Sequence, residues 1–565
     1  MPPRPTRRSA VPTAAMAEPA SDALTNPPDL LSTGPGALRR VLTDPGSFAH
    51  VVELVPWAGE LSDTRGQQPL RMASDLAGDP RITALSVTDN AGGHARLSPD
   101  APGEALRALG HDVIVHVAAR DRNRNALQSL GWDLLSRGLG TILAISGDYP
   151  VDGFQGLAKP VFDVDSVALL ALYRELAEGA VARAITEGTV DAASHDLFLG
   201  CAVDPFKRLE RDLVPQLLKL RLKVDTGADF VITQVGYDAR RQDELLRWMR
   251  RAEITAPVVA NAYILGPGVA RAFHAGRVPG CVVTDELLAL VERHAASPDK
   301  GRAFGLELAA KQLVVARGLG FRGAYLSGHR DAAEIERVLE LAAAHDPADW
   351  RSLVPDVSFA QPGSFHLFEP DGAGLSTDEP ARAYAASLAP AIRRRTRAGV
   401  APFYKLNRLA HGRVFEPGTP GFRTWAGIYG RVERAHLGRP LHVFEQALKV
   451  PLYDCRDCGD CSLPDMAYQC PESHCAKNQR NGPCGGAHDG RCEVGDRPCI
   501  WAEAYRRLKP YGEELGMLER APVITDNRLR RTSAWGNTFL ERDHYARRRQ
   551  VATTAAPTPE KGHAS

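Results

Sequence analysis

Short apolar runs alternate with longer amphipathic segments between about residues 48 and 330 of this chain. The runs are rich in β-branched residues, and the segments between them, such as 166–184 and 243–253, repeat their apolar positions with helical spacing. Strands that alternate with helices in this way are typical of parallel βαβ units. We predict strands at 50–55, 82–88, 112–118, 141–146, 197–203, 229–235, 257–263 and 323–327.

Eight such units within roughly 290 residues fit a (β/α)8 TIM barrel, which is the fold that we predict. A doubly wound parallel sheet is the alternative. The segment around the first strand, HVVELVPWAGELSD, contains no GxGxxG phosphate loop. This argues against a dinucleotide-binding sheet.

Beyond residue 345 the pattern loosens, because Pro and Gly recur and only two helix-like pieces, 381–399 and 423–438, stand out. A cysteine-rich stretch follows, and then a short helical segment at 501–521. We therefore divide the chain into a disordered N-terminal tail (1–40), a barrel (41–345), a connector packed on the barrel (346–440), a small cysteine-rich metal- or cluster-binding domain (441–522), and a C-terminal extension with a disordered tail (523–565).

Composition is that of an ordinary globular protein, with 44% hydrophobic and 24% charged residues. The net charge of +1 does not indicate a long-range electrostatic attraction to nucleic acid or to an anionic membrane. No apolar run approaches the ~20 residues of a membrane helix. The N-terminal tail lacks the apolar core of a secretory signal, and we favour disorder over an organelle transit peptide. We expect a cytoplasmic protein without nucleic-acid or membrane partners; the sequence leaves homo-oligomerisation open.

Polar residues stand at the C-terminal end of each predicted strand or just beyond it. Active sites of (β/α)8 barrels form at this end, from the strand ends and the loops that follow them. We therefore expect a polar site on one rim. Its candidates are Glu53, Thr88, Asp89, Asn90, His116, Asp148, Asp204, Gln234, Asn261, Tyr263, Ser327 and His329.

Four of these candidates also have plainer interpretations. Glu53 stands in the apolar strand VVELV, where an ionised carboxylate is costly unless it is paired or functional. Asp148 follows a tight glycine turn and could equally be a helix N-cap. His116 between valines could be a core histidine, and Gln234 could bond only to backbone. Their arrangement, rather than any single position, favours function.

Several motifs of the barrel resemble the methylenetetrahydrofolate reductase family, in order and spacing, over about residues 48–330. The resemblance implies a flavin-dependent barrel. Such an enzyme reduces 5,10-methylenetetrahydrofolate to 5-methyltetrahydrofolate by ping-pong hydride transfer through flavin N5, and feeds methyl groups to methionine synthesis. The motifs are VELVPW around Glu53, SVTDN around Thr88, VHV around His116, ILAISGDYP around Asp148, KVDTGADFVITQ from Lys223 to Gln234, and the closing GFRGAYLSG.

The resemblance also implies roles for individual residues. Glu53 would be the general acid that protonates the folate N10, which requires a carboxyl that keeps its proton near neutral pH. Asp148 would bind substrate, stabilise the cationic iminium and tune the flavin. Gln234 would hydrogen-bond the pterin, and Lys223 would face the flavin phosphate. The flavin contacts as a whole would be Thr88, His116, Gly147, Asp148 and Lys223.

Two departures from the family bear on the cofactor. Ser146 stands before Gly147, where an arginine is common, and GCAVDPFK replaces the common YPE-type sequence after the fifth strand. Both lie where the flavin ribityl, phosphate or adenine would be recognised, so we expect FAD and keep FMN as the alternative. The electron donor stays open between NAD(P)H and a reduced carrier protein of the ferredoxin type. Direction also stays open, because an enzyme that oxidises methyltetrahydrofolate in a demethylation pathway would carry the same motifs.

Eight of the ten cysteines lie between residues 455 and 499. Without a secretion signal, this spacing favours a metal or a cluster over disulfides. Four thiolates make one zinc site or one 4Fe–4S cluster. The C-x2-C-x2-C run and the later Cys-Pro are ferredoxin-like, so we favour iron–sulfur over zinc. His474 and His488 could be alternative ligands, but we favour interpreting both as solvent-exposed loop residues. The predicted ligands are Cys455, Cys458, Cys461, Cys470, Cys475, Cys484, Cys492 and Cys499.

The same segment, with VFEPGTPG before it and RPCIWAEAYRRLKPY after it, resembles the C-terminal domain fused to, or encoded beside, some methylenetetrahydrofolate reductases. The separate version in acetogenic bacteria is thought to carry iron–sulfur clusters. The resemblance implies a module that relays electrons to the flavin or holds the reductase together. The alternative is an electron-transfer or scaffold partner of a reductase, with a degenerate barrel.

Overall fold

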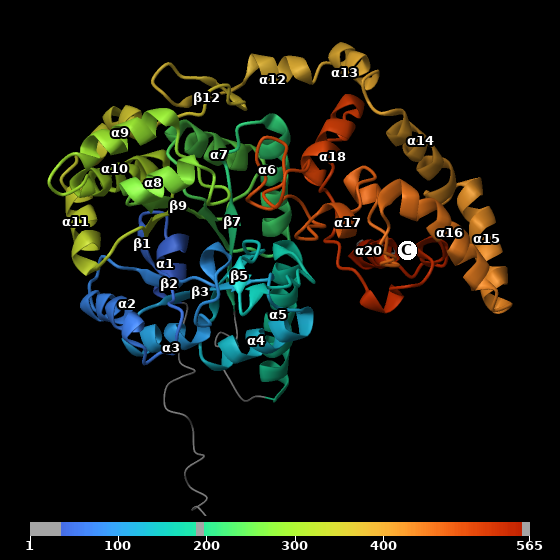
Figure 1. Cartoon of the computed structure of the whole chain (residues 1–565), viewed down its shortest axis with the longest axis horizontal. Helices are drawn as coiled ribbons and strands as arrows, with labels where there is room; N and C mark the ends of the chain where they lie inside the picture. The colour runs from blue at the N-terminus through green and yellow to red at the C-terminus, as the bar shows by residue number, and fades with distance from the viewer. Residues whose placement is uncertain (1–35, 188–196, 556–565) are drawn as a thin grey trace, which may run out of the picture.

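The computed structural model describes residues 36–187 and 197–555, and its centre is a closed barrel of eight parallel strands (Figure 1). Around the barrel the strands follow the order β1-β10-β9-β8-β7-β4-β3-β2, and β1 pairs with both β2 and β10. The predicted barrel and its eight predicted strands are confirmed. Their bounds are β1 Ala49–Leu54, β2 Ala84–Val87, β3 Val113–Ala118, β4 Thr141–Ile145, β7 Phe198–Val203, β8 Phe230–Thr233, β9 Val258–Tyr263 and β10 Gly323–Ser327.

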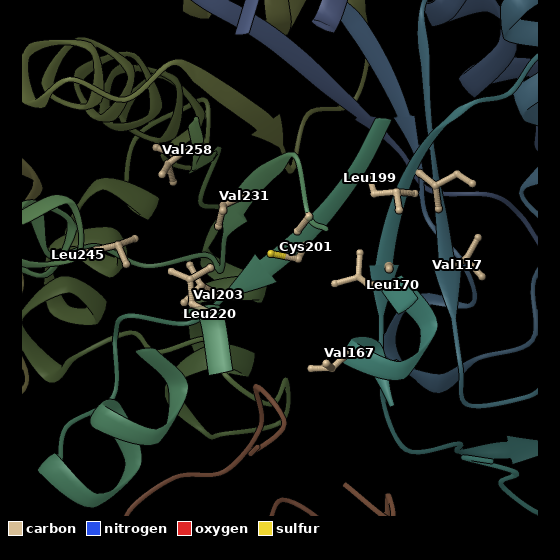
Figure 2. Close-up of a cluster of buried hydrophobic side chains, with 14 of the residues drawn as sticks. Val117, Val167, Leu170, Leu199, Cys201, Val203, Leu220, Val231, Leu245 and Val258 are labelled. Carbon is tan, nitrogen blue, oxygen red and sulfur yellow. The ribbon is translucent and has the colours of Figure 1, made fainter. Parts of the chain in front are cut away.

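Two apolar layers explain why these strands are almost continuously hydrophobic. Inward-facing side chains such as Val51 and Phe230 fill the barrel interior. Outward-facing side chains such as Cys201 on β7 pack with buried helix side chains such as Leu220 on α6 in the cluster of Figure 2. Alternate residues of one strand therefore serve two different cores, and a one-residue slip of register would exchange them.

Helices that follow the strands cover the barrel. A further helix, α1 Ala37–Thr43, packs at β1, where Leu38 and Leu42 join the interior cluster. Asp112 accepts from Leu38 N at 2.8 Å and anchors the start of this helix. Most of the predicted N-terminal tail, residues 1–35, lies outside the described residues. The other helices are α2 Thr64–Asp75, α3 Asp100–Ala108, α4 Arg124–Ser136, α5 Ser166–Glu187, α6 Glu210–Asp225, α7 Ala239–Arg251, α8 Pro267–His274, α9 Asp285–Ala295, α10 Arg302–Leu319 and α11 Ala332–Ala343.

The connector contacts both the barrel and the cysteine-rich module. Its first part, η3 Pro347–Val357 and the hairpin of β11 Phe368–Pro370 and β12 Ser376–Pro380, packs on α10 and α7. Its later helices run along the outer side of the cysteine-rich module (Figure 1), where Arg393 pairs with Glu514 at 2.7 Å. The helical piece expected at 381–399 is two helices, because Pro390 begins a new one. These helices are α12 Arg382–Ser387, α13 Pro390–Arg397, α14 Pro402–Ala410, η4 His411–Phe415, α15 Pro420–Arg434 and α16 Gly438–Tyr453.

The cysteine-rich module has little regular structure and lies against one side of the barrel (Figure 1). Its helix α18 packs on α6, and Trp501 is buried there. At the opposite side, the buried His544 bridges two buried carboxylates, Asp460 and Asp465. The short elements are η5 Pro464–Met466, α17 Pro471–His474, α18 Ile500–Leu508, η6 Lys509–Tyr511, η7 Asn527–Leu529, α19 Ala534–Phe539 and α20 His544–Ala555.

The C-terminal extension folds on the module as η7, α19 and α20, and the tail expected to be disordered lies, from residue 556, outside the described residues. Across the parts of the chain that the structure describes, no helix combines the length and the apolar character needed to cross a bilayer.

Candidate active site at the barrel mouth

Glu53 is near the end of β1, with its carboxyl group at the mouth of the barrel. The side chain is partly buried, and Tyr325 on the neighbouring strand β10 donates its hydroxyl to Oε1 at 3.4 Å. Burial raises the pKa of Glu53 from 4.5 to about 7, against a smaller lowering by this hydrogen bond. Burial and the Glu53 charge raise the pKa of Tyr325, so its hydroxyl stays a donor. Glu53 can therefore hold and release a proton near neutral pH.

His116 on β3 belongs to the same cluster but carries no charge near neutral pH. Its Nε2 lies 2.8 Å from Ser86 Oγ and 3.5 Å from the Tyr325 hydroxyl. Burial lowers the pKa of His116 to about 4. His329, after β10, contacts the backbone oxygen of Glu53 through Nε2 at 2.8 Å, and burial lowers its pKa as well. Glu53 therefore lies among neutral groups, which is why burial dominates its pKa.

Asp148 stands in a tight turn just after β4. Gly147 has a φ of 84°, in the left-handed region, and a Cβ there would lie 3.0 Å from the Ala118 Cβ. The left-handed φ and the close approach of Ala118 both explain why this position is a glycine. Asp148 Oδ2 accepts from Gly92 N at 2.9 Å, and Arg120 donates to the Asp148 backbone oxygen at 3.2 Å. The turn thus fixes a partly exposed carboxylate at the mouth.

Two buried oxygen atoms after β2, Thr88 Oγ1 and Asp89 Oδ1, have no hydrogen-bond partner. The other oxygen of Asp89 accepts from Arg122 at 2.6 Å and from Ala118 N at 3.0 Å. A buried polar atom without a partner costs about 1–3 kcal/mol. A polar group bound at the mouth could pair with these atoms, and the flavin contact of Thr88 stays a prediction.

Gln234 follows β8 and lies beside a buried ion pair. Its Oε1 accepts from Cys281 Sγ at 3.7 Å. A Cβ on Gly280 would lie 3.1 Å from Gln234 Nε2 and 3.3 Å from Asp204 Oδ2, so these groups meet at one point. Asp204 pairs with Lys207 at 2.6 Å. Asp204 is among the residues expected at the rim, whereas Lys207, three residues later in the loop, is not.

Lys223 lies apart from the other predicted site residues. It stands in the last turn of α6, buried between the helix and the barrel, and its Nζ donates to Ala202 O at 2.6 Å. Burial lowers the pKa of Lys223. The residues that the structure does place at the mouth are Glu53, Thr88, His116, Gly147, Asp148 and Gln234.

A loop of the cysteine-rich module reaches the barrel mouth, a contact for which the sequence has no local signal. Lys477 Nζ donates to Gly147 O at 2.7 Å, across 330 residues of sequence. Next to it, Ser146 donates its hydroxyl to Gln479 Oε1 at 3.0 Å, and Lys219 of α6 donates to the same oxygen at 2.9 Å. The module therefore contributes side chains to the strand ends themselves.

The first four cysteines of the module line one cavity of about 20 Å³, together with Lys449 and Arg480. Burial raises the pKa of Cys461 to about 12, although the ammonium group of Lys449 opposes this rise. A cavity of this size holds one water-sized occupant. The four residues are Cys455, Cys458, Cys461 and Cys470.

The other four cysteines form a second group on the barrel side of the module. Burial raises the pKa of Cys475 to about 11, and nearby Cys484 and Cys492 raise it further. Burial, and then Cys484 and Cys475, likewise raise the pKa of Cys499. All these thiols are free. Within residues 36–187 and 197–555, no three His, Cys, Asp or Glu side chains are posed as ligands of one metal ion.

Comparisons with known families give two matches. Residues 64–318 match the family described as methylenetetrahydrofolate reductase, and residues 435–526 match the family described as methylene-tetrahydrofolate reductase C terminal. The first match covers most of the barrel, and the second contains all eight cysteines of the module. The comparison with curated proteins gives no match.

Solved structures match this chain at low overall similarity. A protein from Clostridium thermocellum, described as binding two copies of 5-methyl-5,6,7,8-tetrahydrofolic acid, is 14% identical over 54% of this chain and 98% of its own, with a TM-score of 0.36. A 2,3-dimethylmalate lyase is 16% identical over 55% of this chain and 86% of its own, with a TM-score of 0.30. At these scores the likenesses carry no argument about function.

Proposed function

We propose that this chain reduces 5,10-methylenetetrahydrofolate to 5-methyltetrahydrofolate with a bound flavin, since residues 64–318 match the methylenetetrahydrofolate reductase family and residues 435–526 match the family described as methylene-tetrahydrofolate reductase C terminal. The observation that carries the proposal is Glu53, a carboxyl at the mouth whose pKa is raised to about 7. The same chemistry run backwards would oxidise methyltetrahydrofolate, because a general acid in one direction is the base in the other.

A bound flavin would supply the two-electron carrier, donating or accepting hydride at N5. The unpaired oxygens of Thr88 and Asp89 support a polar group at this mouth. His116, Gly147 and Asp148 would be its further contacts by family resemblance. FAD is the expected form and FMN the alternative. Since Lys223 bonds to backbone, the phosphate end would need other partners here.

Three residues would handle the folate. Glu53, neutral below pH 7, would donate its proton to the folate N10 and so favour opening of the imidazolidine ring to an iminium. Tyr325 supports this role, because its hydroxyl orients the carboxyl without offering it a positive charge. Asp148 would place a negative charge near the cationic iminium. Gln234 would hydrogen-bond the pterin through its amide.

The two groups of four thiols would hold two metal centres, with iron–sulfur favoured over zinc. The cavity that the first group shares, and its position beside Lys449 and Arg480, support a metal centre there, because cations stabilise an anionic thiolate site. Electrons would reach the flavin from NAD(P)H or from a reduced carrier protein. The module would then relay electrons or hold the reductase together.

Anaerobic purification, with flavin, iron, sulfide and zinc measured on one sample, tests these assignments together. We expect a flavin absorbance that 5-methyltetrahydrofolate bleaches. In Glu53→Gln we expect a loss of at least about 100-fold in the rate at which 5,10-methylenetetrahydrofolate reoxidises the reduced flavin. Failure to bind flavin and folate would overturn the proposal. If Glu53→Gln retains cellular function while Cys458→Ser abolishes it, the chain is instead an electron-transfer or scaffold partner.

A further inference from the structure

The loop from Cys475 to Gly486 is tied to the barrel along its length. The backbone N–H groups of Arg480 and Asn481 donate to Asp165 Oδ2 at 3.2 and 2.8 Å. Further along, Gln216 of α6 donates to Cys484 O at 2.5 Å. These contacts begin at the N-terminal end of α5 and continue along α6, so the loop lies over the rim between β4 and β7.

Lys477 is the residue of this loop that reaches the strand ends. It is 4% exposed. Its ammonium group donates to Gly147 O at 2.7 Å and forms an ion pair with Glu493 of the same module. Lysine is rarely buried to this degree unless it is paired. The carbonyl that it holds belongs to the peptide bond that leads into Asp148.

Lys477 adds a support to this turn from outside the barrel. Gly147 has a φ of 84° and no side chain, and Ser146 before it is uncharged. Within the barrel, Gly92 N holds the Asp148 carboxylate, and Lys477 holds the Gly147 peptide that leads into it. A charged donor fixes a carbonyl more firmly than a neutral one does. The barrel's own Arg120 bonds the following carbonyl, that of Asp148.

We infer that Lys477 is a positioning residue of the barrel's active site, supplied by the cysteine-rich module to hold the Gly147–Asp148 turn and to place a positive charge beside it. The two domains then share one active site. The inference rests on the proposed function only for its catalytic consequence; the placement of the turn is a property of the chain itself.

The Lys477 contact lies next in sequence to the thiols of the second group. Lys477 follows Cys475 by two residues, and Gln479 N lies 3.4 Å from Cys475 Sγ. A metal centre held by Cys475 and Cys484 would constrain the path of the loop between them, and with it the position of the Lys477 ammonium group. The module thus acts on the mouth through geometry, whether or not electrons pass through it.

The experiment compares four variants of the full-length protein, purified anaerobically. Lys477→Met removes the cation, and Lys477→Arg keeps one. Lys477→Met/Glu493→Gln removes both partners of the ion pair, so that no buried carboxylate is left without a partner. Lys509→Met is the matched control, because Lys509 also joins module to barrel, through Glu210, away from the mouth. Hydrogen–deuterium exchange of the peptide 141–150 is read first.

We expect faster exchange at Gly147 to Tyr149 in both Met variants at Lys477 and unchanged exchange in Lys509→Met. Flavin oxidation by saturating methylenetetrahydrofolate should fall about 10- to 100-fold in the two Lys477→Met proteins, with KM changed much less, and Lys477→Arg should recover part of it. Wild-type exchange and rate in Lys477→Met/Glu493→Gln would overturn the inference. An inactive wild-type enzyme would instead overturn the proposed function, while exchange still decides the role of Lys477.

Discussion

The raised pKa of Glu53 makes the wild-type protein lose stability as pH rises, and Glu53→Gln should remove that loss. Below pH 4.5 the carboxyl is protonated in the folded and unfolded chains alike. Between pH 4.5 and about 7 the unfolded chain releases the proton while the folded chain keeps it, so stability falls with pH. At 1.36 kcal/mol per pKa unit, the loss is on the order of 3 kcal/mol, an upper value because the side chain is partly exposed.

The assay is urea unfolding of wild type and Glu53→Gln at pH 5 and pH 8. We expect similar free energies of unfolding at pH 5, and a variant up to about 3 kcal/mol more stable than wild type at pH 8. Catalysis should respond in the opposite sense. The wild-type rate of folate reduction should fall as pH rises through about 7, because the general acid loses its proton. The variant should be slow at both values.

Glu286→Gln on the exposed face of α9 is the control, and it should leave the pH dependence of stability unchanged. Parallel stability curves for wild type and Glu53→Gln would refute the reasoning. They would mean that Glu53 ionises like a carboxyl in water, and that a neutral general acid at pH 7 is not available at this position.

Three further predictions test the surroundings of the site and the module. Tyr325→Phe removes the donor that lowers the pKa of the general acid, so the pH midpoint of the reductase rate should move upward; an unchanged midpoint would show that the hydrogen bond contributes nothing. Cys458→Ser and Cys484→Ser should each remove one metal centre and leave the other, as metal analysis of each variant would report; loss of both centres in either variant contradicts two separate groups. His544→Ala removes one partner from each of two buried carboxylates, which keep their arginine partners, and should destabilise the module by about 1–3 kcal/mol in urea unfolding. His436→Ala, at an exposed position, should not.

The local sequence predicted the barrel because its strands carry their own signal. A strand such as Val113–Ala118 is apolar on both faces, since one face fills the interior and the other packs under helices. A run of consecutive apolar residues therefore indicates this burial. In the same way, Pro390 indicates locally that a new helix, α13, begins after α12. Polar residues at the strand ends could be placed on one rim for the same reason, because parallel strands all end there.

The chemical properties of the residues at those positions could be derived only from the tertiary structure. Glu53 could be named from an apolar strand, but its raised pKa depends on burial within the assembled barrel. Tyr325, which donates to it and partly opposes that rise, lies 272 residues away on β10. Lys223 matched a family motif, yet the packing of α6 holds it under the helix, where it bonds to Ala202. A motif specifies residue types and spacing, whereas the direction of a long side chain is decided by its neighbours.

By itself, the sequence determined the eight strands, the rim on which the polar residues gather, and the two sets of four thiols available to the module. Only the tertiary structure decided that Lys477 donates a hydrogen bond to the Gly147 backbone oxygen and that the module forms part of the barrel mouth. The physical reason is separation along the chain. Periodicity and turn chemistry depend on residues only a few positions apart. A contact across 330 residues arises from the packing of two whole domains and leaves no pattern in either segment.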